Sequence, residues 1–184
     1  NYDTAISYYQ EAVSWREKTY GKEHTLTAAC RSFVARALKS AGKLEEALHE
    51  YQTAIGILAP ELNNSDWTQN PVETSKVQSY QYLFDALEAK AEVLVQLFRQ
   101  SNNIEHLIVA LRTQQAAVTV LEKIKNTQIS ESSKIFWSTR SRSLFENSID
   151  TCLLLHQNTS DPSYLDIAFQ LSENSKALLL LTIL

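Results

Sequence analysis

The sequence repeats itself at an offset of 42 residues, and this repeat constrains the fold more than any other feature. The two copies share two alanines, a tyrosine and a glutamine in the same register: Ala5, Tyr9, Gln10 and Ala12, then Ala47, Tyr51, Gln52 and Ala54. Spacings of three and four residues place such side chains on one face of a helix. Small alanines allow neighbouring helices to approach closely, while the tyrosines fill the gap between them. The repeat therefore predicts antiparallel helix pairs that stack into an array.

The composition agrees with an all-α fold. Only three glycines and three prolines interrupt 184 residues, whereas sheets need many more turn residues. The hydrophobic periodicity predicts about seven helices, over residues 2–20, 25–41, 44–58, 73–100, 104–125, 130–156 and 163–184.

These helices divide into regular and irregular parts of what we expect to be one domain. Residues 1–60 carry the clear repeats, and residues 61–72 form a loop, since Asn70-Pro71 and several polar residues cluster there. Residues 73–184 predict longer, divergent helix pairs. Ala110, Gln114 and Ala117 retain part of the repeat spacing but lack its aromatic residue. A separate helical bundle in this second part is the alternative to a continuous solenoid.

The repeat residues resemble those of the tetratricopeptide repeat. The 42-residue period is similar to the longer variant in kinesin light chains, where Arg-Glu-Lys, Gly, His and Thr follow one another in the connecting segment. Here Arg16-Glu17-Lys18, Gly21, His24 and Thr27 stand in that order. The resemblance implies a scaffold that binds a protein or peptide partner through the first helices of its pairs. We expect His24 to shape the turn between helices.

The last helical segment is similar to the final repeat helix before a CHAT domain, a caspase-like peptidase domain, in bacterial proteins. Residues 168–181 carry the features of that link: Ala-Phe, a glutamate, Ser-Lys-Ala and a run of leucines. The chain has no methionine, and it begins and ends within helical patterns. We therefore expect a segment of a longer protein, whose peptidase His and Cys would lie beyond Leu184.

Charge and cysteine content limit the classes of partner. A net charge of −4, from 17 basic and 21 acidic residues, gives no reason to expect binding to nucleic acid or an anionic membrane surface. No apolar run is long enough to span a bilayer. Cys30 and Cys152 lie far apart in helical patterns, which favours two buried or half-buried thiols and a reducing, cytoplasmic compartment.

No catalytic, metal or cofactor motif stands out. Glycine-rich phosphate loops and Gly-x-Ser-x-Gly are absent. Glu46 and His49 have the Glu-x-x-His spacing of di-iron bundles, but no second copy exists, so we expect a solvated surface pair. The sequence therefore predicts a segment that is not an enzyme and needs no cofactor.

Candidate partner-binding residues lie on three predicted helices. Residues 25–41 offer four of them on or beside one face: Ser32, Phe33, Arg36 and Lys39. An acidic or extended peptide is one expectation for them, and an ordinary solvated face is the alternative. Tyr80, Trp137 and Arg140 complete the set, and a core position is the alternative for Trp137. Self-association through the apolar run at 178–184 is the alternative to partner binding.

Overall fold

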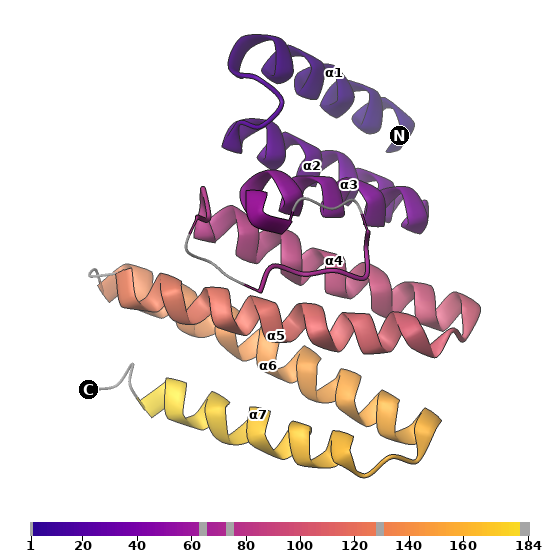
Figure 1. Ribbon diagram of the computed structural model, residues 1–184, viewed down its shortest axis with the longest axis vertical. Coiled ribbons are helices and arrows are strands. Elements are labelled where there is room, and N and C mark those ends of the chain that lie inside the picture. Colours follow the sequence, from indigo (N-terminus) through magenta and orange to yellow (C-terminus); the bar gives the residue numbers. More distant parts are fainter. Residues whose placement is uncertain (1, 63–65, 73–75, 128–130, 181–184) are drawn as a thin grey trace.

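The computed structural model describes residues 2–62, 66–72, 76–127 and 131–180, without the side chains of 125–135 and 177–180. Its described part contains seven α-helices and one short 3₁₀ helix, η1. The predicted all-α array is confirmed (Figure 1). The elements are α1 (Tyr2–Tyr20), α2 (Thr25–Ser40), α3 (Leu44–Leu58), η1 (Pro60–Leu62), α4 (Tyr80–Ser101), α5 (Ile104–Thr127), α6 (Glu131–Thr159) and α7 (Ser163–Leu180).

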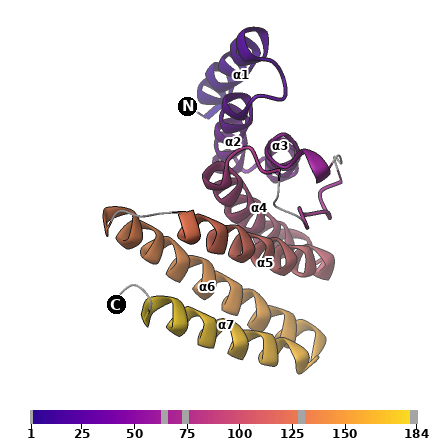
Figure 2. The same ribbon diagram turned by 60° about the vertical axis from the view of Figure 1, so that its left-hand side comes forward.

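Each helix packs against the next one in the chain, so α1 and α7 lie at opposite ends of the stack (Figure 1). In addition, α2 contacts α4, which continues the array across the long connection between α3 and α4. Figure 2 shows α2 and α6 on one side of the stack and α3 with the loop after it on the other. The prediction of longer helices in the second half is confirmed, because α4, α5 and α6 contain 22, 24 and 29 residues.

Among the described residues, the core consists of two clusters of buried side chains. The larger runs from Ile6 in α1 to Leu144 in α6 and includes the repeat residues Ala47, Tyr51 and Ala54. The second joins the last four helices through residues such as Phe98, Leu107, Phe145, Leu155 and Leu171. Alanines at the repeat positions are fully buried in α3, as close packing between helices requires.

The turns of the first three helices use the residues that the repeat supplies. Gly21 and Gly42 have φ angles of 95° and 78°, a left-handed conformation in which glycine is favoured. The His24 ring caps α2, because its Nδ1 accepts a hydrogen bond from the Leu26 amide at 3.1 Å. It also stacks on Tyr20 with ring centroids 4.9 Å apart. The expectation that His24 shapes this turn is confirmed.

An arginine joins three successive helices. Arg31 in α2 reaches Glu17 in α1 at 2.7 Å and Glu50 in α3 at 2.9 Å. All three side chains are about three-quarters shielded from solvent. Charge-assisted hydrogen bonds of this kind are stronger than neutral ones, so Arg31 fixes the spacing of the first three helices.

The prediction that the fourth helix begins near residue 73 is wrong. Residues 73–75 lie outside the described part, and α4 begins only at Tyr80, after the N-cap Ser79. Gln78 makes non-helical contacts instead: its backbone amide donates to Leu58 O, and its side-chain amide donates to Glu23 O and Ile57 O. These bonds tie Gln78 to the turn between α1 and α2 and to the end of α3.

A buried lysine holds the loop between α3 and α4. The Lys90 side chain is fully buried in α4, and its Nζ donates to Gln52 Oε1 at 2.7 Å, Gln69 O at 2.9 Å and Asn70 Oδ1 at 3.0 Å. Thr113 in α5 also donates to Asn70 Oδ1. The described loop residues 66–72 are thereby tied to three helices.

Candidate binding groove

A groove runs along the side of the stack formed by α2, α4 and α6. It contains two hollows. The first, of about 410 Å³, lies between α2 and α4 and reaches Arg140 of α6. The second, of about 230 Å³, lies between α4 and α6 with Gln114 of α5 also lining it. Glu88 and Glu92 line both hollows, so the two hollows adjoin, and we call them together the groove.

The structure brings five of the seven predicted binding residues together in the first hollow: Ser32, Phe33, Arg36, Lys39 and Arg140. Tyr80 does not line either hollow, whereas its neighbour Tyr82 does. Trp137 lies in the core, where it is 4% exposed and packs edge-on against Phe84. The core alternative for Trp137 is therefore correct, and the indole is not available to a partner.

Phe33 provides the main exposed apolar surface of the first hollow. Its side chain is 40% exposed, rests against Tyr9 at 5.8 Å between ring centroids, and carries the Arg36 guanidinium over its ring at 5.1 Å. An aromatic ring beside an arginine is typical of interaction hot spots. Tyr51 forms a buried part of the lining, where burial raises the pKa of its hydroxyl to about 12, so the phenol stays protonated.

Three acidic residues of α4 face the cations of α2 and α6. Lys39 pairs with Glu92 at 2.6 Å, and Arg140 pairs with Asp85 at 2.9 Å and with Glu88. Burial raises the pKa values of the Asp85 and Glu88 carboxyls, and the Arg140 charge opposes this effect. Lys39, one of the two cations expected to attract an acidic peptide, is thus already paired within the groove, and so is Arg140.

The charges lining the groove are balanced in number. Four cations, Arg36, Lys39, Arg99 and Arg140, face four carboxylates, Asp85, Glu88, Glu92 and Asp150. Such a surface has no net preference for an anionic ligand, since attraction and repulsion cancel at a distance. Recognition would therefore depend on local pairing in each hollow rather than on the overall field.

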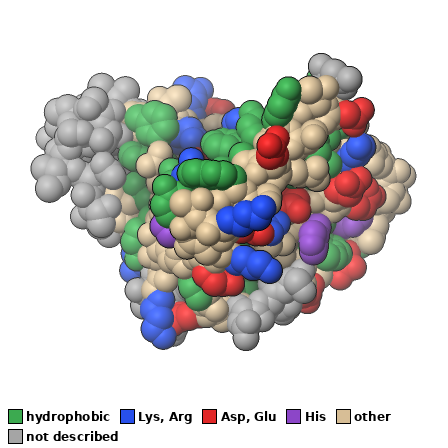
Figure 3. Space-filling model, turned by 90° about the horizontal axis from the view of Figure 1, so that it is seen from above, with side chains coloured by type: hydrophobic (Ala, Val, Ile, Leu, Met, Phe, Trp, Pro, Cys, Tyr) green, Lys and Arg blue, Asp and Glu red, His purple; other side chains and the backbone are tan. Residues whose placement is uncertain are grey.

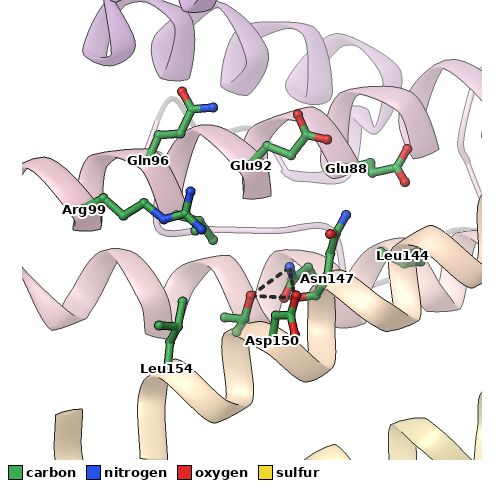
Figure 4. A pocket seen from close by; sticks show the side chains of 11 residues that line it. Glu88, Glu92, Gln96, Arg99, Leu144, Asn147, Asp150 and Leu154 are labelled. Atoms are coloured by element: carbon green, nitrogen blue, oxygen red, sulfur yellow. Dashed lines mark hydrogen bonds between the residues drawn. The ribbon is translucent and has the colours of Figure 1, made fainter. Parts of the chain in front are cut away.

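The second hollow, which we call the α4/α6 cavity, combines charged, amide and apolar side chains (Figure 4). Gln114 is 3% exposed, and its Nε2 donates to Thr151 Oγ1 at 3.0 Å and Asn147 O at 3.3 Å. Its Oε1 is buried and accepts no hydrogen bond from the described residues. A buried carbonyl oxygen without a donor is destabilising by about 1–3 kcal/mol.

The acidic half of the groove was not predicted, although the sequence contains a signal for it. Asp85, Glu88 and Glu92 follow one another at spacings of three and four residues, which places them on one helical face. Nothing in the sequence indicates that Gln114, from the second helix of its pair, reaches between α4 and α6. That contact depends on the crossing of α5 and α6.

The remaining predicted features lie outside the groove. Both cysteines have free thiols, Cys152 buried and Cys30 half-buried, as expected. Glu46 and His49 are exposed on α3, and the described residues contain no group of three His, Cys, Asp or Glu side chains arranged to hold a metal ion. Within the same residues, no helix is long and apolar enough to cross a membrane.

Comparison with known proteins finds a family similarity for the first part of the chain. No curated protein and no solved structure matches the sequence. A model of the tetratricopeptide repeat family matches residues 1–59, about a third of the chain, and these residues form α1, α2 and α3. Residues 1–59 are therefore similar to tetratricopeptide repeats, and the helices that follow extend the same kind of all-α stack.

Proposed function

We propose that this chain is a protein-interaction module that binds a peptide or protein segment along the groove of α2, α4 and α6. The observation that carries the proposal is the convergence of Phe33, Arg36 and Tyr82 with paired charges in one open hollow. Helical repeat arrays use such extended surfaces for binding. The similarity of residues 1–59 to tetratricopeptide repeats supports the same role.

The groove suits a peptide better than a small molecule. Its hollows are partly open and are lined largely by charged and polar side chains, whereas small-molecule sites are enclosed and mainly apolar. Aromatic and arginine side chains at the centre, with charged residues around them, match the composition of protein interfaces.

The experiment is a selection of peptides from a random displayed library on the whole chain, with each enriched peptide retested on variants. Phe33→Ala and Arg36→Ala remove the exposed centre of the first hollow, and both side chains are exposed enough for the fold to persist. We expect each variant to weaken binding by about 1–3 kcal/mol, the usual loss for an interface hot spot.

Tyr8→Ala is the matched control, because Tyr8 is an aromatic residue on α1, 69% exposed and outside both hollows. It should leave binding unchanged. Peptides that lose affinity with Tyr8→Ala but not with Phe33→Ala would place the binding surface elsewhere and contradict the proposal.

Self-association is the second candidate, favoured by the exposed side of α1. At the 42-residue offset, Tyr2 and Trp15 correspond to Leu44 and Ile57 of α3. The α3 residues are 2% and 7% exposed, whereas those of α1 are 58% and 56% exposed. Figure 3 looks onto this end of the stack, where hydrophobic side chains lie among charged ones at the surface. The run 178–184, which also suggested self-association, falls outside the described side chains.

Sedimentation over a range of protein concentrations tests this candidate. If α1 mediates dimerisation, Trp15→Glu abolishes a dimer that the wild type forms. A dimer that persists in Trp15→Glu, or a wild type that stays monomeric, contradicts self-association through α1.

We further propose that the module regulates a CHAT peptidase domain in the same polypeptide. The proposal rests on the resemblance of residues 168–181 and on Phe169, which is 67% exposed on α7 and available to a following element. The test compares peptidase activity of the full-length parent with that of a form lacking residues 1–184. Equal activity and equal response to partners in both forms would contradict this role.

A further inference from the structure

Residues 66–72, which we call the strap, contact α3, α4 and α5 on the side of the stack away from α2 and α6 (Figure 2). Lys90 Nζ of α4 donates to Gln69 O and to Asn70 Oδ1 of the strap. Thr113 Oγ1 of α5 also donates to Asn70 Oδ1, at 3.1 Å. Lys90 and Thr113 are fully buried, so the strap helps to shield a polar layer of the stack from water.

The strap buries little apolar surface of its own. Asp66 and Gln69 are exposed, and the Val72 side chain is 93% exposed. Trp67 is half-buried at one end of the strap, where its ring centroid lies 5.4 Å from that of His106. Segments with few buried apolar contacts open locally at a lower free energy than the core of a fold. We therefore expect the strap to open while the helices stay folded.

Opening of the strap changes the surroundings of the Lys90 amine. With the strap closed, Nζ donates to three acceptors, Gln69 O, Asn70 Oδ1 and Gln52 Oε1 of α3, and the first two move away with the strap. Hydration of the uncovered amine favours its charged form, whereas burial disfavours that form. Burial lowers the pKa of Lys90 to about 7, against about 10.4 for a hydrated lysine. Opening is therefore coupled to the uptake of a proton by Nζ.

The strap and its neighbouring helices bring other ionisable groups close to this site. The Asp66 carboxylate, in the strap itself, opposes the effect of burial on the lysine. Arg112 of α5 lines a hollow beside the strap, and arginine stays charged throughout the neutral pH range. Glu45 and His49 of α3 and His106 of α5 lie at the tryptophan end of the strap. Histidine side chains change charge between pH 5 and pH 8, so their contribution has to be separated from that of the lysine.

We propose that the strap is a proton-linked latch over α3, α4 and α5, which closes as Lys90 Nζ releases a proton to solvent and opens as Nζ takes one up. Opening uncovers the polar layer formed by Gln52, Lys90 and Thr113. Above about pH 7 the closed form holds fewer protons than the open form, so a rise in pH favours closure. The latch is independent of the function proposed for the groove.

The test labels a thiol placed beneath the strap. Thr113→Cys in a Cys30→Ala background puts a thiol at a fully buried position that contacts Asn70. Its reaction with a thiol reagent is followed from about pH 6 to about pH 8.5. Each rate is divided by the rate for the urea-unfolded chain at the same pH, which corrects for ionisation of the thiol itself. This labelling ratio should change by no more than about twofold up to pH 7, and fall about 15-fold between pH 7 and pH 8.5.

Variants assign the linked proton to the lysine. Lys90→Met keeps the aliphatic stem and removes the amine, so the labelling ratio should become independent of pH, whatever its absolute value. Asn70→Ala removes one anchor of the strap and should raise the ratio at every pH without abolishing its fall. His49→Gln and His106→Gln should also keep the fall. Lys123→Met, at an exposed lysine of α5, is the control and should change nothing.

A labelling ratio that does not fall with pH, or a fall that persists in Lys90→Met, overturns the proposal. Loss of the fall in either histidine variant overturns it as well, because an imidazole would then be the linked group. Labelling of Thr113→Cys no faster than that of the buried Cys152 thiol would show that the site is reached only by global unfolding, which also overturns the latch.

If Lys90→Met does not fold, Asp66→Asn decides the question. The Asp66 carboxylate opposes the effect of burial on Lys90, so its removal should move the onset of the fall to lower pH. An onset at the same pH as in the parent overturns the proposal.

Discussion

Lys90 allows a test of how the burial of an ionisable side chain changes the pH dependence of the stability of this fold. Its side chain is fully buried, and burial lowers the pKa of its ammonium to about 7. In the unfolded chain a lysine titrates near pH 10.4. Between these values the unfolded chain carries a proton that the folded protein has released, so the free energy of unfolding rises with pH.

The magnitude follows from linkage. From about pH 7 to about pH 8.5, the release of this proton increases the free energy of unfolding by about 1–2 kcal/mol. The window ends there because burial raises the pKa of the Cys152 thiol to about 11. Above about pH 8.5 the unfolded chain loses the thiol proton that the folded protein keeps, which acts in the opposite direction.

The perturbation is Lys90→Met, which keeps the aliphatic stem and removes the ammonium. Urea unfolding is measured across the pH window for wild type, for Lys90→Met and for Lys123→Met, an exposed lysine of α5 as control. The rise with pH should be smaller in Lys90→Met by about 1–2 kcal/mol, and unchanged in Lys123→Met. The same rise in all three proteins would show that the hydrogen bonds to Gln52, Gln69 and Asn70 keep Lys90 charged, and that burial does not lower the pKa of Lys90.

Three further predictions concern the framework of the stack. Arg31→Gln should lower the free energy of unfolding by about 1–2 kcal/mol in urea titrations, because it breaks both charged links between α1, α2 and α3. The control is Arg142→Gln, at an exposed pair with Glu146, which should leave the midpoint of urea unfolding unchanged. Gly42→Ala should cost about 1 kcal/mol, since alanine is strained at φ 78°; an unchanged melting temperature would contradict this. A thiol reagent near neutral pH should modify Cys30 before Cys152, because the buried thiol of Cys152 reacts only after unfolding. Equal rates of modification for the two cysteines would argue against the burial of Cys152.

The sequence was sufficient to predict the helices of the first repeats because local and long-range signals agree there. The ends of α1 and α3 fall at the predicted residues, marked by Gly21 and by Ala59-Pro60. The start of α4 was missed because the deciding contacts of Gln78 are to Glu23, Ile57 and Leu58, which are distant in sequence. Hydrophobic periodicity predicts which face of a helix a residue occupies, but it does not predict which distant turn or helix end that residue contacts.

The same limit applies to the groove. Four residues on α2 were predicted from one helical face, and the structure places them in one hollow. Their electrostatic setting was not predictable, since the partners of Lys39 and Arg140 are on α4, 53 and at least 52 residues away in sequence. The cations predicted on α2 therefore belong to a surface of mixed charge.

The most direct test of the central claim is to map where a library-selected peptide binds. The peptide carries a photo-reactive group, and the cross-linked residues are identified by mass spectrometry. We expect cross-links to α2, α4 and α6, concentrated around Phe33, Tyr82 and Asn147. Cross-links confined to the exposed side of α1 around Trp15, or to α7 around Phe169, would contradict it.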